Sequence, residues 1–173
     1  MKILKFPELR QTYEYDCGAI ATQAVLAYYS VDLGEQTIMK MAGTQKSGTP
    51  IAGLKKVFKK YGLSFEAGQM TIEDVKKYID KKIPVILLLQ AWADEKPDWQ
   101  KDWHDGHYVV AIGYGAKKIY FEDPYKLVRT YLDDKELLER WHDIDHKGKK
   151  HINWGMAVFG KKTPKAHQAI HMD

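Results

Sequence analysis

Hydrophobic positions follow a helical spacing in the first half of the chain and a strand spacing in the second half. In the first half, apolar residues recur every three or four positions, which is typical of amphipathic helices. This spacing predicts helices over residues 17–29, 36–41, 50–62 and 71–79, and a short edge strand over residues 63–67. Two of the helices have start signals, namely Thr49 as an N-cap before Pro50 and Thr71 with Asp74 as a capping box.

From Pro84 onward, the period changes to that of strands. Runs rich in β-branched and aromatic residues predict strands over residues 85–89, 107–114, 118–123, 127–131 and 154–160, with a capped helix over 132–141. Helices followed by strands are typical of an α+β fold with segregated layers. We therefore expect one domain over residues 1–160, in which a helical lobe (about 1–83) packs on an antiparallel β lobe (about 84–160), followed by a basic tail over 161–173. The cleft between the lobes is the expected place for a site.

The composition is that of one globular domain, since 45% of the 173 residues are hydrophobic. The formal net charge of +4 comes from lysines that alternate with acidic residues, which indicates solvated helix faces and no nucleic-acid partner. The longest apolar run, residues 84–89, is of strand length and falls short of the roughly 20 residues that span a membrane. A single cysteine and a start without a signal-peptide core predict a cytoplasmic protein. No pattern indicates an oligomeric state.

The only cysteine, Cys17, lies where a polar, aromatic segment gives way to an alanine-rich helix. The free N–H groups and the dipole of a first helical turn stabilise negative charge, and the thiolate is the nucleophilic form of cysteine. Asp16 is expected to cap this helix through its side chain, and Gly18 leaves room for an incoming carbonyl group. Because a free cysteine is commonly a small buried hydrophobe, this segment alone leaves both interpretations open.

A histidine and an aspartate occupy matching positions of a predicted hairpin. If residues 114–116 form a three-residue loop, Gly113 pairs with Lys117 and His107 pairs with Asp123. Directly opposed residues share a face of the sheet, so the carboxylate of Asp123 can accept the imidazole N–H and orient the ring. Considered alone, His107 is better interpreted as a structural histidine in a strand, with its hydrogen bonds satisfied. With Asp123 opposite, it becomes a candidate general base.

Other polar and aromatic residues complete the predicted site. Gln11 lies six residues before Cys17, where its amide and the Cys17 backbone N–H can donate to a developing oxyanion. Substrate contacts are expected at Gly18, Trp92, Trp103 and Gly106, with Trp92, Trp99 and Trp103 on a flap over residues 91–105. The remaining histidines lack cysteine or carboxylate partners at firm spacing, so we expect surface histidines and no metal or other cofactor.

These residues, in this order and spacing, resemble a known family. The resemblance is carried by residues 11–29, 48–49 with the helix that follows, 84–86, 106–110 and 123–124, within the range 11–141. The pattern is similar to that of the bacteriocin-processing peptidases, papain-like cysteine peptidases that remove double-glycine leader peptides. It implies a papain-like fold with Cys17 as nucleophile, His107 as general base and acid, Asp123 as its orienting residue and Gln11 in the oxyanion hole.

The expected activity is hydrolysis of a peptide or protein substrate through an acyl-enzyme. Family members are commonly the N-terminal domain of an ABC transporter, whereas this sequence contains no membrane or ATPase portion, so we expect a stand-alone member. Two alternatives stay open: acyl or peptidyl transfer from the same acyl-enzyme, and a non-catalytic peptide-binding module. The presence of both Cys17 and His107 makes the binding module the weakest of the three.

Overall fold

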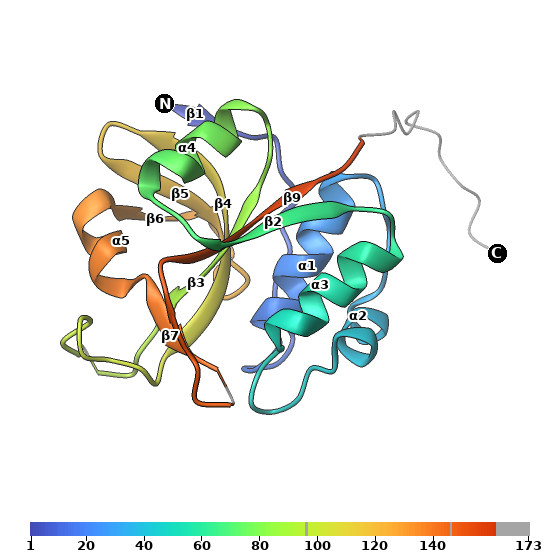
Figure 1. Ribbon diagram of the computed structural model, residues 1–173, viewed down its shortest axis with the longest axis horizontal. Coiled ribbons are helices and arrows are strands. Elements are labelled where there is room, and N and C mark those ends of the chain that lie inside the picture. The colour runs from blue at the N-terminus through green and yellow to red at the C-terminus, as the bar shows by residue number, and fades with distance from the viewer. Residues whose placement is uncertain (96, 146, 162–173) are drawn as a thin grey trace.

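A large antiparallel sheet forms the centre of the protein in the computed structural model, which describes residues 1–95, 97–145 and 147–161 (Figure 1). Its strands run in the order β2-β9-β3-β4-β5-β6, and β1 pairs with β4. They are β1 (Lys2–Ile3), β2 (Ser64–Gln69), β3 (Val85–Gln90), β4 (Gly106–Gly115), β5 (Lys118–Glu122), β6 (Thr130–Asp133) and β9 (Trp154–Phe159). A separate two-stranded sheet consists of β7 (His142–Ile144) and β8 (Lys150–Ile152).

The helices lie in two groups beside this sheet (Figure 1). The first group contains α1 (Cys17–Tyr28), α2 (Glu35–Ala42) and α3 (Ile51–Lys60). The second group contains α4 (Ile72–Asp80) and α5 (Asp134–Arg140), which lie against the sheet. Helix α4 packs on β4, and α5 packs on β6. Gly53 allows α2 and α3 to pack closely, because a Cβ atom there would collide with the backbone of Ala42.

The core sits where α1 meets β3 and β4. Every residue of β3 is buried, so both faces of this strand are covered, as its continuous apolar sequence requires. Helix α1 packs on β4 and contains small buried residues, including Ala21 and Ala24, each 1% exposed. Small side chains let the helix axis approach the sheet closely. Cys17 is thereby held at the end of β4 that carries His107.

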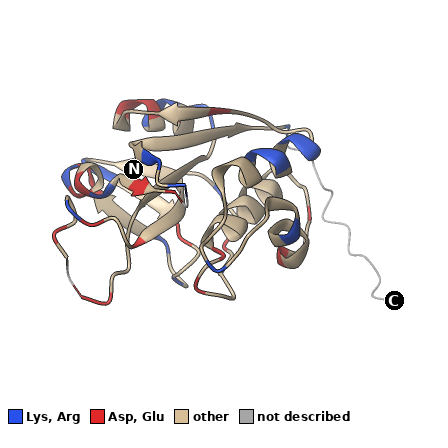
Figure 2. Cartoon of the chain, turned by 60° about the horizontal axis from the view of Figure 1, so that its bottom comes forward, with Lys and Arg blue, Asp and Glu red and all other residues tan. Residues whose placement is uncertain are grey.

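Lysines and arginines alternate with acidic residues on the outer helices and loops (Figure 2). The outer face of α3, for example, carries Lys56, Lys59 and Lys60, while its buried face contains Leu54 and Phe58. This is the solvated charge pattern that the sequence predicted. Within the described residues, no helix is both long enough and apolar enough to cross a lipid bilayer.

The predicted α+β class and helix order are confirmed, and the capping box of Thr71 and Asp74 is present. The start of α3 differs from the prediction: its N-cap is Pro50 in an extended conformation, and the Thr49 hydroxyl bonds to Thr44 at 2.9 Å and not to the helix. Three short strands, β1, β7 and β8, were not predicted, because two or three residues carry too little periodicity. The domain limits stay a prediction, and residues 162–173 of the expected basic tail lie outside the described residues.

The predicted register of the β4–β5 hairpin is wrong. Gly113 pairs with Tyr120 and Val110 pairs with Glu122, with a bulge between them, and the turn has two residues and not three. Lys117 in this turn has a left-handed φ of 56°, which the sequence did not signal. Continuing the observed register places Asp123 opposite Val109, diagonal to His107 on the same face, where contact is still possible.

Candidate active site

Cys17 is the first residue of α1 and is buried, with 7% of its surface exposed. The preceding residue, Asp16, occupies the N-cap position, but its side chain does not cap the helix, contrary to the prediction. Instead, its Oδ2 accepts hydrogen bonds from the backbone N–H groups of Thr12 and Tyr13, each at 3.2 Å. The physical reason is the tight turn before Cys17, which presents two donors to the same oxygen. This carboxylate therefore fixes the approach to the thiol.

The Asp16 carboxyl group is also close to Glu35 at the start of α2. Burial and a hydrogen bond with Glu35 raise the pKa of Asp16 to about 6. Glu35 in turn accepts a hydrogen bond from the Thr12 hydroxyl at 2.7 Å. Protonation of Asp16 below about pH 6 therefore relieves its repulsion with Glu35.

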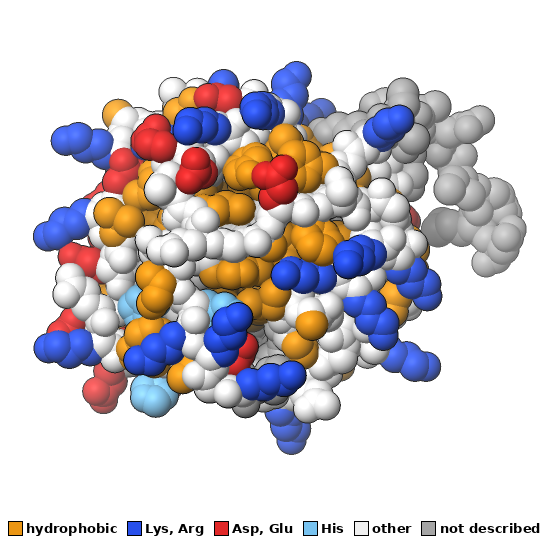
Figure 3. Space-filling model, viewed as in Figure 1, with side chains coloured by type: hydrophobic (Ala, Val, Ile, Leu, Met, Phe, Trp, Pro, Cys, Tyr) orange, Lys and Arg blue, Asp and Glu red, His pale blue; other side chains and the backbone are white. Residues whose placement is uncertain are grey.

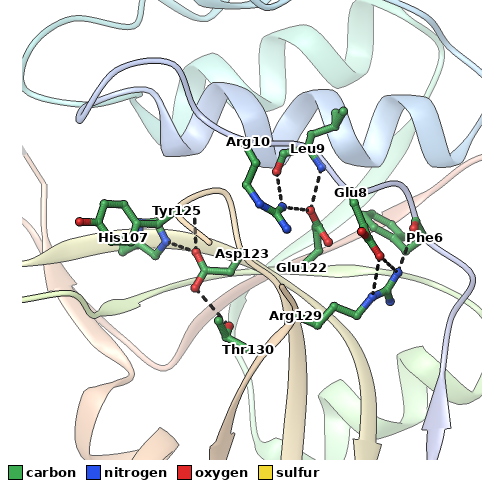
Figure 4. A network of polar contacts seen from close by, with 10 residues as sticks. All are labelled: Phe6, Glu8, Leu9, Arg10, His107, Glu122, Asp123, Tyr125, Arg129 and Thr130. Carbon is green, nitrogen blue, oxygen red and sulfur yellow. Dashed lines mark hydrogen bonds and ion pairs between the residues drawn. The ribbon is translucent and has the colours of Figure 1, made fainter. Parts of the chain in front are cut away.

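His107 connects the thiol to a carboxylate. Its Nε2 lies 2.7 Å from Oδ1 of Asp123 (Figure 4), and its ring interacts electrostatically with the side chain of Cys17. Burial lowers the pKa of His107, but the interactions with Asp123 and Cys17 outweigh burial and raise this pKa to about 9. The imidazole is therefore protonated at neutral pH, as an imidazolium–thiolate pair requires.

The Asp123 carboxylate is held by four donors. Its Oδ1 accepts from His107 and from the backbone N–H of Tyr125 at 3.0 Å, and its Oδ2 accepts from the Thr130 hydroxyl and the Trp92 indole N–H, each at 3.1 Å. Burial raises the pKa of Asp123, but these bonds, led by that of His107, lower the pKa overall. The carboxylate is thus ionised and fixed in orientation.

Gln11 is placed beside the strand that leads to Asp123. Its backbone N–H donates to the carbonyl of Pro124 at 2.9 Å. Its side-chain Nε2 donates to the carbonyl of Tyr13 at 2.7 Å, and its Oε1 is buried without a partner among the described residues. A side-chain amide has two N–H groups, so one is available to a ligand. The structure thus brings Gln11 into the neighbourhood of the other predicted residues.

A cavity of about 180 Å³ opens beside the thiol. Its lining includes Cys17, Thr49, Gly106, Tyr108 and Asp143. Gly106 was predicted to contact the substrate and does line this cavity. A Cβ atom at this position would lie 2.5 Å from the Asp143 carboxylate, so any larger residue would displace that carboxylate.

Gly18 was also predicted to contact the substrate, but the structure gives it a packing role. A Cβ atom at position 18 would lie 2.8 Å from Cβ of Thr49 and 2.9 Å from the ring of Tyr108. The glycine therefore allows α1 to dock on β4 next to Cys17. Gly18 is not among the residues that line the cavity.

The three tryptophans of the predicted flap pack against the protein and do not line the cavity at Cys17. The Trp92 ring lies 5.2 Å from that of Tyr125, and its indole N–H holds Asp123. The Trp103 ring lies 4.5 Å from that of His142, and the Trp99 ring is covered by the Arg140 guanidinium at 4.0 Å. These contacts anchor the segment over residues 91–105. Trp92 and Trp103 as substrate contacts stay a prediction.

A second, wider hollow of about 640 Å³ continues from the first cavity, and Pro50, Ile51 and Asp145 line both. Its apolar residues include Ile152 and Trp154, and its basic residues are Lys55, Lys147, Lys149, Lys150 and His151. Figure 3 shows hydrophobic side chains exposed on this face of the molecule with lysines around them. No cluster of potential metal ligands is present among the described residues.

Sequence reasoning missed several residues that support the site. Gln90 is completely buried and holds three groups: its Oε1 accepts from the Asp105 N–H at 2.8 Å, and its Nε2 donates to the His142 carbonyl and to Asp143. Glu122, adjacent to Asp123, forms an ion pair with Arg10. A polar residue at the end of an otherwise apolar strand was the only available signal for Gln90.

A model of the Peptidase C39 family matches residues 5–144. The lactococcin-G-processing and transport ATP-binding protein LagD of Lactococcus lactis subsp. lactis is 29% identical over 119 residues, covering 67% of this chain and 15% of that protein. The lactococcin transport/processing ATP-binding protein LcnC-like of L. lactis strain IL1403 is 28% identical over 145 residues, covering 83% and 19%, respectively. The chain thus spans less than a fifth of the length of these relatives.

Two solved peptidase structures share the fold. The peptidase domain of Streptococcus ComA, a bi-functional ABC transporter involved in a quorum-sensing pathway, has a TM-score of 0.65 and 19% identity, covering 92% of this chain and 97% of that domain. A double-glycine-motif protease from an AMS/PCAT transporter, in complex with the leader peptide, has a TM-score of 0.66 and 21% identity, covering 94% and 95%. These matches confirm the papain-like fold. Because the family model matches most of its residues, the chain belongs to the Peptidase C39 family of cysteine peptidases.

Proposed function

We propose that the chain hydrolyses peptide bonds with Cys17 as nucleophile, His107 as general base and acid, and Asp123 as the residue that orients the imidazole. The observation that carries this proposal is the position of His107, which bonds to Asp123 and interacts electrostatically with Cys17. The thiolate attacks the carbonyl carbon, and the imidazolium gives its proton to the leaving amine. The neutral imidazole then takes a proton from water, which hydrolyses the acyl-enzyme and restores the thiolate.

Gln11 completes the proposed machinery as an oxyanion donor. Its backbone is tied to Pro124, one residue after Asp123, and one amide N–H remains available beside the bond to Tyr13. Together with the backbone N–H of Cys17, this group would stabilise the charge that develops on the carbonyl oxygen. Removal of one such donor lowers kcat by about 10²–10³-fold in other hydrolases, and we expect the same of Gln11→Ala.

The proposed substrate is a peptide with a double-glycine cleavage site. The similar proteins are lactococcin-processing transporters and a double-glycine-motif protease bound to a leader peptide. The narrow cavity at Cys17 suits a small substrate residue such as glycine, and the wider hollow beyond it suits a bulkier segment of the same peptide. We place the reaction in the cytoplasm, where an unpaired nucleophilic thiol stays reduced.

The test is cleavage of synthetic leader peptides that contain Gly-Gly, compared with matched peptides that contain Ala-Ala, followed by mass spectrometry. Cleavage after Gly-Gly by the wild type and none by Cys17→Ser supports the proposal. Hydrolysis gives a product with a free carboxylate even when an amine is added. Acyl transfer would instead give an amide of that amine. In parallel, the rate of alkylation of Cys17 by iodoacetamide should stay high below the free-thiol pKa of about 8.5. In His107→Ala, this acid limb of the pH–rate profile should be lost. An ordinary thiol profile together with intact peptides would contradict the proposal.

A further inference from the structure

The N-terminal strap, residues 2–11, runs along the strands that carry the candidate site. It begins as β1, which pairs with β4, and continues with a hydrogen bond from the Leu4 N–H to the Ile112 carbonyl at 2.7 Å. It ends at Gln11, whose N–H donates to Pro124 next to Asp123. The strap therefore connects the rigid sheet to the segment that approaches the thiol.

An ion pair fixes the strap just before Gln11 (Figure 4). Arg10 Nη1 donates to Oε1 of Glu122 at 2.8 Å and to the carbonyl of Leu9 at 2.6 Å. The same carboxylate oxygen accepts from the Leu9 N–H at 2.9 Å. The Glu122 side chain is 1% exposed and that of Arg10 is 20% exposed, so this pair is shielded from water. One carboxylate oxygen thus holds both the backbone and the side chain of the strap.

This ion pair is poorly arranged as a source of stability. Glu122 Oε2 and Arg10 Nε lack hydrogen-bond partners among the described residues, and burial raises the pKa of Glu122 despite the nearby Arg10. The desolvation of a buried ion pair commonly cancels its attraction, so its value often lies in fixing one geometry. Here each partner is adjacent in sequence to a residue of the candidate site, Arg10 to Gln11 and Glu122 to Asp123.

We propose that Arg10 and Glu122 are positioning residues that set Gln11 relative to the strand of Asp123 and so align the oxyanion site. This inference rests on the proposed role of Gln11 in peptide hydrolysis. Arg10 suits this role because one nitrogen of its planar guanidinium, Nη1, donates both to Glu122 and to the backbone carbonyl of Leu9. These two bonds fix the orientation of the strap backbone next to Gln11. Neither side chain touches the reacting atoms; both act through Gln11.

The strap offers a matched control. Glu8 forms an ion pair with Arg129 at 3.3 Å two residues upstream of Arg10, but the Glu8 side chain is 57% exposed. Glu8→Gln therefore breaks an ion pair on the same strap without freeing Gln11. Arg10→Met keeps most of the side-chain volume and removes the charge, and Glu122→Gln is a second, isosteric variant should Arg10→Met fold poorly.

The first measurement is hydrogen exchange of the Gln11 backbone amide by NMR in the full chain. Protection of this amide should fall by about tenfold in Arg10→Met, the factor expected for loss of one hydrogen bond, and stay unchanged in Glu8→Gln. Unchanged protection in both Arg10→Met and Glu122→Gln, or an equal loss in Glu8→Gln, would overturn the inference. This result does not depend on turnover, so it decides the positioning role even if no leader peptide is cleaved and the proposed function fails.

The second measurement is kcat and KM on a cleavable leader peptide. Arg10→Met should lower kcat by about 10- to 100-fold with KM nearly constant, since misplacement of one group affects the transition state most. In a Gln11→Ala background, Arg10→Met should cause no further loss. The acid limb of Cys17 alkylation should be the same as in the wild type, because His107 and Asp123 are untouched. Losses that multiply with Gln11→Ala would show a merely structural role.

Discussion

Two buried aspartates belong to the candidate site, Asp16 directly before Cys17 and Asp123 bonded to His107, and their environments differ. Asp123 accepts from four donors, which lower its pKa, whereas Asp16 faces Glu35, and burial together with this contact raises its pKa to about 6. Both residues are almost inaccessible to solvent, at 2% and 0% exposure. Burial alone therefore does not set the charge state here; the partners do. The environment of Asp123 therefore favours the ionised carboxylate next to His107, whereas that of Asp16 favours the protonated form.

The largest expected difference concerns turnover. Asp123→Asn should lower kcat by about 10²–10⁴-fold, because an amide cannot stabilise the imidazolium and allows the wrong tautomer. Asp16→Asn should lower kcat by less than about tenfold, since the amide oxygen can still accept from the turn that precedes Cys17. Steady-state kinetics on a leader peptide compare the two variants directly. Equal losses of kcat in the two variants would show that both carboxylates support His107 in catalysis.

The next expected effect is a stability change on the alkaline side. The folded-state pKa of His107, about 9, lies above its ordinary value of 6.5, so its contribution is fully present below pH 6.5 and is lost as the pH rises through 9. The Tm of the wild type should therefore fall by about 5 °C more than that of His107→Ala between pH 6.5 and 9.5. Calorimetry at several pH values measures this difference; parallel curves for the two proteins would exclude a raised pKa.

A smaller effect is expected for Asp16 on the acid side. Its folded-state pKa of about 6 lies above the ordinary value of 3.8, so its contribution is present below pH 3.8 and is lost as the pH rises through 6. Relative to Asp16→Asn, the wild type should lose a few °C of Tm over this interval. Asp123 acts in the opposite sense, because its lowered pKa gives a contribution that is lost only as the pH falls below the ordinary range. A Glu35→Gln variant should reduce the Asp16 effect without abolishing it, because burial is the larger cause of the raised pKa of Asp16.

The smallest expected effect concerns the donors to Asp123. Trp92→Phe removes one N–H from Oδ2 while Thr130 still donates to the same atom, so kcat should fall by only about two- to fivefold. The double variant with Thr130→Val should lose more than the product of the single losses, because each donor can partly compensate for the other. If Trp92→Phe instead raises KM alone, Trp92 contacts the substrate, as the sequence suggested.

The sequence predicted which residues lie together at the candidate site better than it predicted their arrangement. Cys17, His107 and Asp123 were identified from residue type and context, and the contact of His107 with Asp123 forms although the predicted hairpin register was wrong. It forms because a diagonal position keeps both side chains on one face. By contrast, Arg10 and Glu122 are separated by 112 positions, and only the folded chain brings them together. Long-range polar contacts of this kind have no local signature.

The place of β9 in the sheet has a consequence for synthesis of the protein on the ribosome. This strand, Trp154–Phe159, pairs with β2 on one side and with β3 on the other, so the sheet is closed only after nearly the whole described chain has left the exit tunnel. Cys17 emerges early, but the sheet that holds His107 beside it matures last. Such non-local strand pairing is slow to form. A nascent chain therefore carries its thiol without a completed sheet until β9 has emerged from the ribosome.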